Sequence, residues 1–364
     1  MSELDELRQR VETLDSAILG AISARLDAVR RIGELKKAAG VPLRDWRRER
    51  EVIRRAEETA QALGISKPLA RDVMRAVIQE SCTIQERQSY SVYGGESERI
   101  VVIGGAGKMG RWLVDFFENQ GHLVDICDPA AENTADATGV ADCPALRNAQ
   151  IAVIATPLSA APDVVEQLAA VAFPGVACDI ASLKSHLAPT IREARAAGLR
   201  YTSVHPMFGP NTRTLSDQVI CICDCGDSEA TQRVRRFFAD TAATLVDLTL
   251  DEHDRIVSHV LGLSHLLNLV FASALAGSGF AYDRLNQVGS TTFRSQMQTT
   301  AAVVHENPEL YYEIQTLNRF TPEVNQRLTE HLRRWTDWIS CGDHDAFVQA
   351  MRLARDWTDK HDAH

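Results

Sequence analysis

Residues 99–110 read RIVVIGGAGKMG, and this stretch decides the fold of the middle of the chain. A short run rich in β-branched residues is followed by Gly105, Gly107 and Gly110 in GxGxxG spacing, and a helical pattern begins there. In such a turn the first glycine permits a tight bend, the second lets the backbone approach a pyrophosphate, and the third lets the helix pack on the strand. The context predicts a dinucleotide-binding unit, although a glycine turn that binds nothing has the same spacing.

An acidic residue at the expected distance supports this interpretation. Asp128 closes the next β-rich run, 23 residues after Gly105. A carboxylate at this place accepts hydrogen bonds from ribose hydroxyls and repels a 2′-phosphate, which favours NAD over NADP. The expected cofactor-binding residues are Gly105, Gly107, Met109, Gly110, Asp128 and Thr156.

Outward from this stretch, β-rich runs alternate with helical runs. The runs IVVIGG, HLVDICD, IAVIATP, VACDIAS and YTSVHP are joined by two more, QVICICDC and ATLVDLT. This alternation predicts the α/β class, with a parallel sheet of Rossmann type. From Asp251 the pattern is helical to the end of the chain. We therefore expect a linker at 91–98, a dinucleotide-binding domain at 99–250 and an all-helical dimerisation and substrate domain at 251–364.

The first 90 residues have only helical patterns. Apolar residues recur in steps of three and four from Leu4 to about Lys37, and two further helices are expected at about 44–63 and 67–89. The first helix would be roughly 50 Å long at 1.5 Å per residue. Two shorter helices cannot cover that length, so we expect residues 1–90 to form an intertwined dimer.

Charge and composition limit the possible partners. The net charge is −10, and residues 1–90 carry 17 Lys+Arg against 15 Asp+Glu while the remainder carries 22 against 34. An acidic chain is a poor candidate for binding nucleic acid. The arginine-rich helices fit either an anionic ligand or a solvated surface. The eight cysteines lack framework spacing, and we find neither a signal-peptide core nor a membrane-spanning run, so we expect a cytoplasmic protein.

Motifs for metals and phosphates are absent from the sequence. It contains no HExxH, no paired CxxC and no GxxxxGK[ST], so no metal is expected. Cys221, Cys223 and Cys225 alternate, which places them on one face of a strand, where buried packing is the favoured interpretation.

The stretch SVHPMFGP, residues 203–210, puts His205 at the end of the fifth β-rich run between a strand and two prolines. Ligands of open parallel sheets lie beyond the carboxyl ends of the strands. A histidine beside a nicotinamide can accept the proton of a hydroxyl while the adjacent C–H leaves as hydride. We expect His205 to be catalytic, with a structural role as the alternative.

Together, GGAGKMG, SLK at 182–184, HPMFGP at 205–210 and the helical C-terminal region resemble the prephenate dehydrogenases. Residues 1–90 resemble the all-helical chorismate mutases. The whole chain is similar to the bifunctional chorismate mutase/prephenate dehydrogenases of bacterial tyrosine synthesis. The resemblance implies rearrangement of chorismate to prephenate, then NAD-dependent oxidative decarboxylation of prephenate to 4-hydroxyphenylpyruvate, in a homodimer with tyrosine as a feedback ligand.

For the mutase, the rearrangement needs no nucleophile, so the protein helps by holding the compact conformer and stabilising charge on the ether oxygen. The resemblance implies that Arg25 and, from the partner chain, Arg8 bind carboxylates, and that Lys36 and Gln85 meet the ether oxygen. Further substrate contacts are implied for Asp45, Arg48, Glu49 and Ser81. Salt bridges between helices of the dimer are the alternative role for these charges.

For the dehydrogenase, the resemblance implies that His205 draws on the 4-hydroxyl of prephenate and that Ser182 orients His205 or touches that hydroxyl. It implies that Arg294 binds a substrate carboxylate. From their positions, we expect His265, on the helix after the sheet domain, to line the substrate pocket and Lys184, near Ser182, to serve substrate or structure. We interpret His253 as a capping or surface residue. Two rival functions remain. One is a dehydrogenase of another hydroxy acid with a non-catalytic helical dimerisation module, and the other is a non-catalytic NAD-sensing regulator.

Overall fold

The computed structural model describes residues 2–38, 46–89, 96–130, 140–212, 215, 218–239 and 241–359, with the side chains at 37–38, 46–50, 83, 85–89 and 141 left out. The chain divides into two compact units. One comprises Met1–Ser182 with Leu187–Leu250, and the other comprises Leu183–His186 with Asp251–His364.

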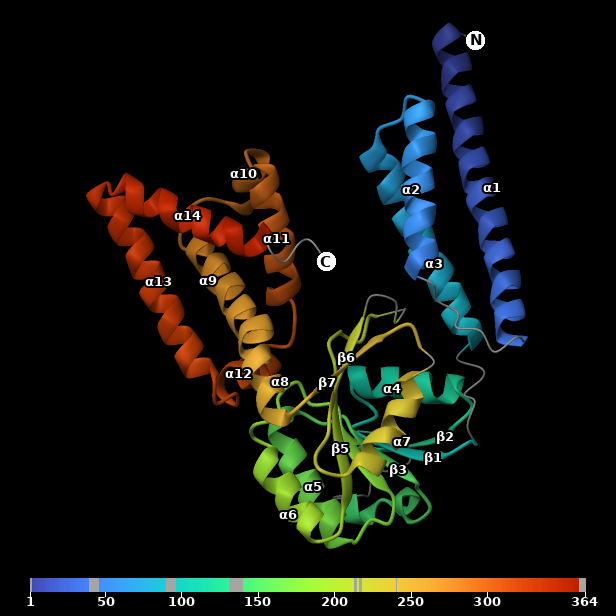
Figure 1. Ribbon diagram of the computed structural model, residues 1–364, viewed down its shortest axis with the longest axis vertical. Coiled ribbons are helices and arrows are strands. Elements are labelled where there is room, and N and C mark those ends of the chain that lie inside the picture. Colours follow the sequence, from blue (N-terminus) through green and yellow to red (C-terminus); the bar gives the residue numbers. More distant parts are fainter. Residues whose placement is uncertain are drawn as a thin grey trace. The chain divides into compact units, whose positions relative to one another are not determined.

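Three helices form the N-terminal region: α1 (Glu3–Ala38), α2 (Trp46–Ala62) and α3 (Lys67–Ser89). Helix α3 packs against both α1 and α2, as Figure 1 shows in blue and cyan. Helix α2 ends where Gly64 takes a left-handed φ of 71° and the Ile65 N–H donates to the carbonyl of Ala60. The all-helical prediction for this region is confirmed.

A seven-stranded sheet forms the centre of the first unit, in the order β2-β1-β3-β4-β5-β6-β7. The strands are β1 (Arg99–Ile103), β2 (Leu123–Cys127), β3 (Ile151–Ile154), β4 (Val176–Asp179), β5 (Arg200–Pro206), β6 (Val219–Cys223) and β7 (Thr244–Leu248). Neighbours are parallel except for the pair β5–β6, which is antiparallel. The predicted α/β sheet is confirmed, with this reversal as a difference. A parallel connection usually crosses over through a helix, and the described parts of the segment 207–218 form no helix.

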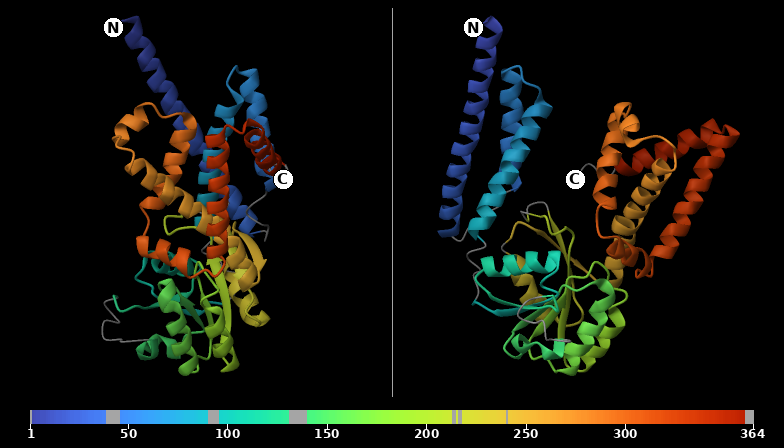
Figure 2. Two further views of the ribbon diagram at one scale, coloured as in Figure 1. Left: turned by 90° about the vertical axis from the view of Figure 1, so that its left-hand side faces the viewer. Right: turned by 180° about the vertical axis from the view of Figure 1, so that it is seen from behind.

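Helices cover both faces of this sheet (Figures 1 and 2). They are α4 (Lys108–Asn119), α5 (Ala161–Ala170), α6 (Ala188–Ala196) and α7 (Ser228–Ala239), with short 3₁₀ turns at Val140–Asp142, Pro144–Arg147 and Leu158–Ala160. On one face, phenylalanines of α4 and α7 pack on the apolar residues of the strands, and Phe117 and Phe237 meet edge to face at 5.2 Å. This core fixes α4 relative to the strand that precedes it.

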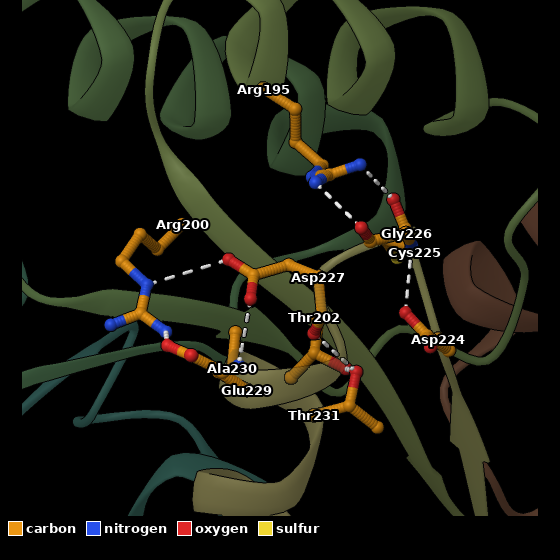
Figure 3. A network of polar contacts seen from close by, with 10 residues as sticks. All are labelled: Arg195, Arg200, Thr202, Asp224, Cys225, Gly226, Asp227, Glu229, Ala230 and Thr231. Carbon is orange, nitrogen blue, oxygen red and sulfur yellow. Dashed lines mark hydrogen bonds and ion pairs between the residues drawn. The ribbon is translucent and has the colours of Figure 1, made fainter.

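A polar network fixes the turn that follows β6 (Figure 3). The Arg195 guanidinium donates to two backbone carbonyls of that turn, and Arg200 forms an ion pair with Asp227. Burial alone would raise the pKa of Asp227, but the backbone N–H at the start of α7 and the Arg200 guanidinium outweigh it and lower that pKa. The network lies at the amino end of β5, opposite the end that carries His205.

The second unit is helical, as predicted. It contains α8 (Leu250–Val257), a π-helical turn (Ser258–Leu263), α9 (Ser264–Ala276), α10 (Tyr282–Gln287), α11 (Thr291–Val304), α12 (Pro308–Thr316), α13 (Thr321–Cys341) and α14 (His344–Asp359). At the π turn, the carbonyl of Gly262 accepts a hydrogen bond from the Gln315 side-chain amide at 2.9 Å.

One helical run bears on the expectation that the chain has no membrane-spanning segment. Leu250–Ala276 is 27 residues long with a mean hydropathy of 1.6 over its most apolar window, so by length and composition it could cross a membrane. Length and composition are weak evidence, because an apolar helix in a water-soluble protein passes the same test. The alternating cysteines need a second correction: β6 ends at Cys223, and Cys225 lies beyond it, partly exposed.

Candidate functional site

The glycine turn lies between β1 and α4. Gly104 has a φ of +85°, and its N–H donates to the carbonyl of Cys127 at 2.9 Å. The left-handed bend is therefore at Gly104, one residue before the glycine to which sequence spacing assigned it. A Cβ at Gly110 would lie 2.2 Å from the carbonyl oxygen of Gly104, and one at Gly105 would lie 2.8 Å from a methyl of Ile126. Both glycines are required by close packing.

Helix α4 begins beside this turn. Gly107 is its N-cap, with extended backbone and no side-chain cap, so the first N–H groups of the helix are left for another acceptor. The amino end of a helix favours an anion such as a pyrophosphate. Met109, the remaining residue assigned to this loop, is partly buried in the first turn of α4.

Asp128 follows β2 and faces the same turn. One of its carboxylate oxygens accepts from the Ala106 N–H at 3.0 Å, and the other accepts from the Ala130 N–H at 2.9 Å. A carboxylate has about four acceptor positions, so it can bind several donors at once. Asp128 and Thr156 both line a pocket of about 320 Å³ beside Gly104. The hydroxyl oxygen of Thr156 is buried there without a hydrogen-bond partner among the described residues. The glycine turn, the carboxylate and the unpaired hydroxyl together fit a dinucleotide.

The same edge of the sheet carries the residues assigned to the dehydrogenation. Because β1 to β5 are mutually parallel, their carboxyl ends lie at one edge, where the glycine turn, Asp128 and Thr156 also lie. Ser182 comes three residues after β4, and His205 lies at the end of β5 with 4% of its surface exposed. The structure thus brings Ser182 and His205 to the edge that carries the nucleotide turn.

A buried pair supports the segment that carries Ser182. The Tyr201 hydroxyl donates to the Asp179 carboxylate at 2.9 Å, and that carboxylate also accepts from the Ala181 N–H at 3.0 Å. Burial, followed by the charge of Asp179, raises the pKa of Tyr201, so the phenol stays protonated and keeps donating.

In the N-terminal region the structure brings Arg25 and Ser81 together. The Arg25 guanidinium donates to the Ser81 hydroxyl at 2.5 Å, and that hydroxyl donates to the carbonyl of Val77 at 2.6 Å. Lys36 is half-buried further along α1, whereas Arg8 is exposed on the first turns of α1. Asp45 and the side chains of Arg48, Glu49 and Gln85 lie outside the described residues.

The remaining assigned residues belong to the second unit. Arg294 is exposed on α11. His265 is half-buried on α9 and stacks on Tyr311 with ring centroids 4.3 Å apart, and burial lowers its pKa. Lys184 is fully buried, and its backbone N–H donates to Asp254 at 2.8 Å.

Asp254 was missed by the sequence analysis, and His253 was misplaced by it. Both are fully buried, and the Nδ1 atom of His253 lies 2.8 Å from the Asp254 carboxylate, so the surface or capping interpretation of His253 is wrong. Burial alone would raise the pKa of Asp254, but hydrogen bonds from His253 and Ser185 outweigh it and lower that pKa. Helical spacing could have predicted the burial of both residues, because residues 253, 254, 257 and 258 lie on one face of the helix and all four are buried.

Three family models match the chain in order. Chorismate mutase type II matches residues 7–86, the nucleotide-binding domain of prephenate dehydrogenase matches 120–247, and the dimerization domain of prephenate dehydrogenase matches 249–353. A T-protein of Enterobacter agglomerans is 26% identical over 365 residues, which cover 99% of this chain and 94% of the relative. The chain belongs to the bifunctional chorismate mutase/prephenate dehydrogenases. It is therefore both an isomerase and an oxidoreductase, and neither rival function is favoured.

Two relatives from Streptomyces pristinaespiralis match the two parts separately. A 4-amino-4-deoxychorismate mutase is 35% identical over 83 residues, 23% of this chain and 64% of the relative. A 4-amino-4-deoxyprephenate dehydrogenase is 28% identical over 284 residues, 75% of this chain and 94% of the relative. Among solved structures, a prephenate dehydrogenase from A. aeolicus in complex with hydroxyphenyl propionate and NAD+ shares the fold. Its TM-score is 0.58 at 13% identity, with 73% of this chain and 99% of that chain covered.

Proposed function

We propose that this enzyme rearranges chorismate to prephenate with its N-terminal helices and oxidises prephenate to 4-hydroxyphenylpyruvate at the carboxyl edge of its sheet. The observation that carries the proposal is the arrangement of that edge. A dinucleotide turn, Ser182 and a buried histidine, His205, meet there in a chain that also pairs Arg25 with Ser81.

In the mutase reaction, Arg25 binds a carboxylate of chorismate. Its hydrogen bond to Ser81, which is itself bonded to a backbone carbonyl, fixes the direction of the guanidinium before the substrate arrives. Lys36 and Gln85 donate to the ether oxygen, where negative charge develops. The further contacts that we propose come from Arg48, Asp45, Glu49 and, from the partner chain, Arg8.

The cofactor is NAD+, as in the A. aeolicus structure. When bound, it supplies the acceptor for the hydride that leaves C4 of prephenate. Gly105, Gly107 and Gly110 shape the turn that receives the pyrophosphate, with Met109 beside it. Asp128 accepts from the ribose hydroxyls, and Thr156 donates its otherwise unpaired hydroxyl.

In the dehydrogenase reaction, His205 accepts the proton of the 4-hydroxyl of prephenate. A neutral imidazole is required for this, and the backbone of β5 fixes its position. Ser182 hydrogen-bonds the same hydroxyl or orients His205, and Arg294 binds a substrate carboxylate with His265 lining the pocket. Loss of the ring carboxylate as CO2 makes the ring aromatic, and this drives the reaction.

We also propose that the enzyme is a cytoplasmic homodimer that tyrosine inhibits by feedback. The apolar residues of α1 support the dimer, since Leu7, Leu14 and Ile18 are each more than half exposed in a single chain. A partner α1 would cover them. Sedimentation at micromolar concentration should give twice the chain mass of 40.2 kDa.

The direct test incubates the enzyme with chorismate, with and without NAD+, and identifies the products. Prephenate without the cofactor and 4-hydroxyphenylpyruvate with it are expected. Chorismate that remains unchanged in both reactions would refute the mutase proposal, and supplied prephenate that remains unchanged with NAD+ would refute the dehydrogenase proposal.

A second candidate concerns the group at C4. The two Streptomyces relatives are named for substrates with an amino group there, and their identities of 35% and 28% exceed the 26% of the T-protein. We therefore propose 4-amino-4-deoxychorismate and 4-amino-4-deoxyprephenate as alternative substrates. Measurement of kcat/KM for the amino and the hydroxy substrates tests this candidate. A value for the amino substrates far below that for the hydroxy substrates excludes it.

A further inference from the structure

The segment that follows His205 contacts the side chain of Trp112 on helix α4. The indole N–H of Trp112 donates to the backbone carbonyl of Thr212 at 2.9 Å. The same ring meets Phe208 edge to face, with centroids 5.1 Å apart. Trp112 therefore holds the segment 207–212 at two points, three and seven residues after His205.

Helix α4 connects this contact to the nucleotide turn. Trp112 lies in the second turn of α4, five residues after the N-cap Gly107. Its ring stacks on Phe116 at 5.3 Å, and Phe116 stacks on Phe238 of α7 at the same distance. Near the far end of the helix, Gln120 donates to the carbonyl of Phe237 at 2.7 Å. Because α4 is fixed along its length, a shift at its first turn is transmitted to Trp112.

Other contacts also hold the described residues between Pro206 and Val219, since Leu215 is fully buried in the core and its carbonyl accepts from the Gln218 N–H at 3.1 Å. The N–H of Met207 donates to Val219 at the start of the segment, and the N–H of Thr212 closes a turn on Gly209. No helix or strand forms within the described residues between Pro206 and Val219. The carbonyl of Thr212 accepts a hydrogen bond from the indole N–H, and tryptophan is the residue that combines a large apolar ring with one N–H donor.

We propose that Trp112 is a positioning residue that couples the dinucleotide site to the prephenate site. Anion binding at the amino end of α4 shifts its first turn, and the Trp112 contact then positions the segment after His205 for the second ligand. NAD+ therefore tightens the binding of prephenate, and by linkage prephenate tightens the binding of NAD+ equally. This inference rests on the proposed dehydrogenase function of His205.

The test uses the product 4-hydroxyphenylpyruvate, which is already aromatic and does not turn over with NAD+. Its Kd is measured by titration calorimetry on the full-length enzyme, with and without saturating NAD+. In the wild type we expect NAD+ to lower this Kd about 5-fold or more, the usual lower range of coupling between sites.

Trp112→Phe keeps an aromatic ring and removes the donor. We expect it to reduce the NAD+ effect to less than about 2-fold and to raise the KM for prephenate about 3- to 10-fold, the effect of one neutral hydrogen bond. We expect kcat to change less than 2-fold.

Trp335→Phe is the matched control, because Trp335 lies on α13 and packs on Trp338 and Phe347. It should leave the NAD+ effect and the KM unchanged. The proposal is overturned if Trp112→Phe keeps the wild-type coupling, if it lowers only the Tm, or if the wild type shows no coupling. Failure of the proposed function is a different result, since the wild type would then neither oxidise prephenate nor bind the product.

Discussion

In the central sheet, Ile100 and Val102 are completely buried, whereas Leu14 and Ile18 on α1 are 54% and 57% exposed. Both sets are apolar residues at regular spacing. The sheet buries its residues within one chain, because helices on both faces cover it. Among the described helices, α3 packs along α1, and we propose that a second copy of the chain covers the other apolar face of α1. The same spacing rule thus leads to a self-contained fold in one region and to a proposed interface in the other.

The two regions also build their sites differently. At the sheet, the residues of the proposed site lie at strand ends, so backbone geometry places His205 and the glycine turn. In the helices the proposed site depends on long side chains, and the hydrogen bond to Ser81 orients Arg25. This difference can be tested with variants that lower one of the two activities and leave the other unchanged.

The largest expected effect is that of His205→Asn. Asparagine retains a hydrogen-bonding group but accepts no proton, so dehydrogenase kcat should fall about 10²–10⁴-fold, the scale of general-base loss. Mutase activity on chorismate should not change. Steady-state assays of both reactions check this, with His344→Asn on the exposed start of α14 as the control. Normal turnover of supplied prephenate by His205→Asn would show that the histidine is structural.

The mutase counterpart is Arg25→Ala. Loss of an oriented charged donor should lower mutase kcat about 10²–10³-fold, while oxidation of supplied prephenate persists. The control is Arg54→Ala, which removes an exposed arginine of α2. Arg54 forms an ion pair with Glu58, one turn further along the same helix, so its loss should have little effect on either activity. If the two arginine variants behave alike, the site assignment is wrong.

The third prediction concerns Asp254 in the second unit. Its folded pKa is lowered, so its contribution to stability is present above the unfolded pKa of about 3.9 and is lost as the pH falls through the folded value. Asp254→Asn should lower the free energy of unfolding at neutral pH by about 2–3 kcal/mol and flatten its dependence on pH below about 4. Denaturant titrations across pH measure both, and a variant with the wild-type acid slope would contradict the assignment.

The smallest expected effect comes from the proposed interface of α1. Ile18→Glu places a charge on the apolar face and should weaken the dimer of N-terminal helices and lower mutase activity about tenfold at micromolar concentration. Higher protein concentration should restore the activity, because association follows mass action. Concentration-independent loss of activity would show instead that Ile18 acts within a single chain.

Local patterns in the sequence were sufficient for several features. Helical spacing predicted the three N-terminal helices, the alternation of β-rich and helical runs predicted the sheet, and GGAGKMG predicted the nucleotide turn. Each of these features depends on residues that are close in the sequence, so periodicity and glycine spacing are enough to predict it. His205 was placed at a strand end for the same reason.

Other features were decided by tertiary structure, because they depend on residues far apart in the chain. The left-handed bend lies at Gly104 since a Cβ at that position would lie 2.7 Å from the carbonyl oxygen of Ala155 on the neighbouring strand connection. Asp254 acquires its role from backbone groups about seventy residues earlier. Trp112 meets Thr212 across 100 residues of chain. A pattern within one segment carries no record of such partners, so only the folded chain could place them.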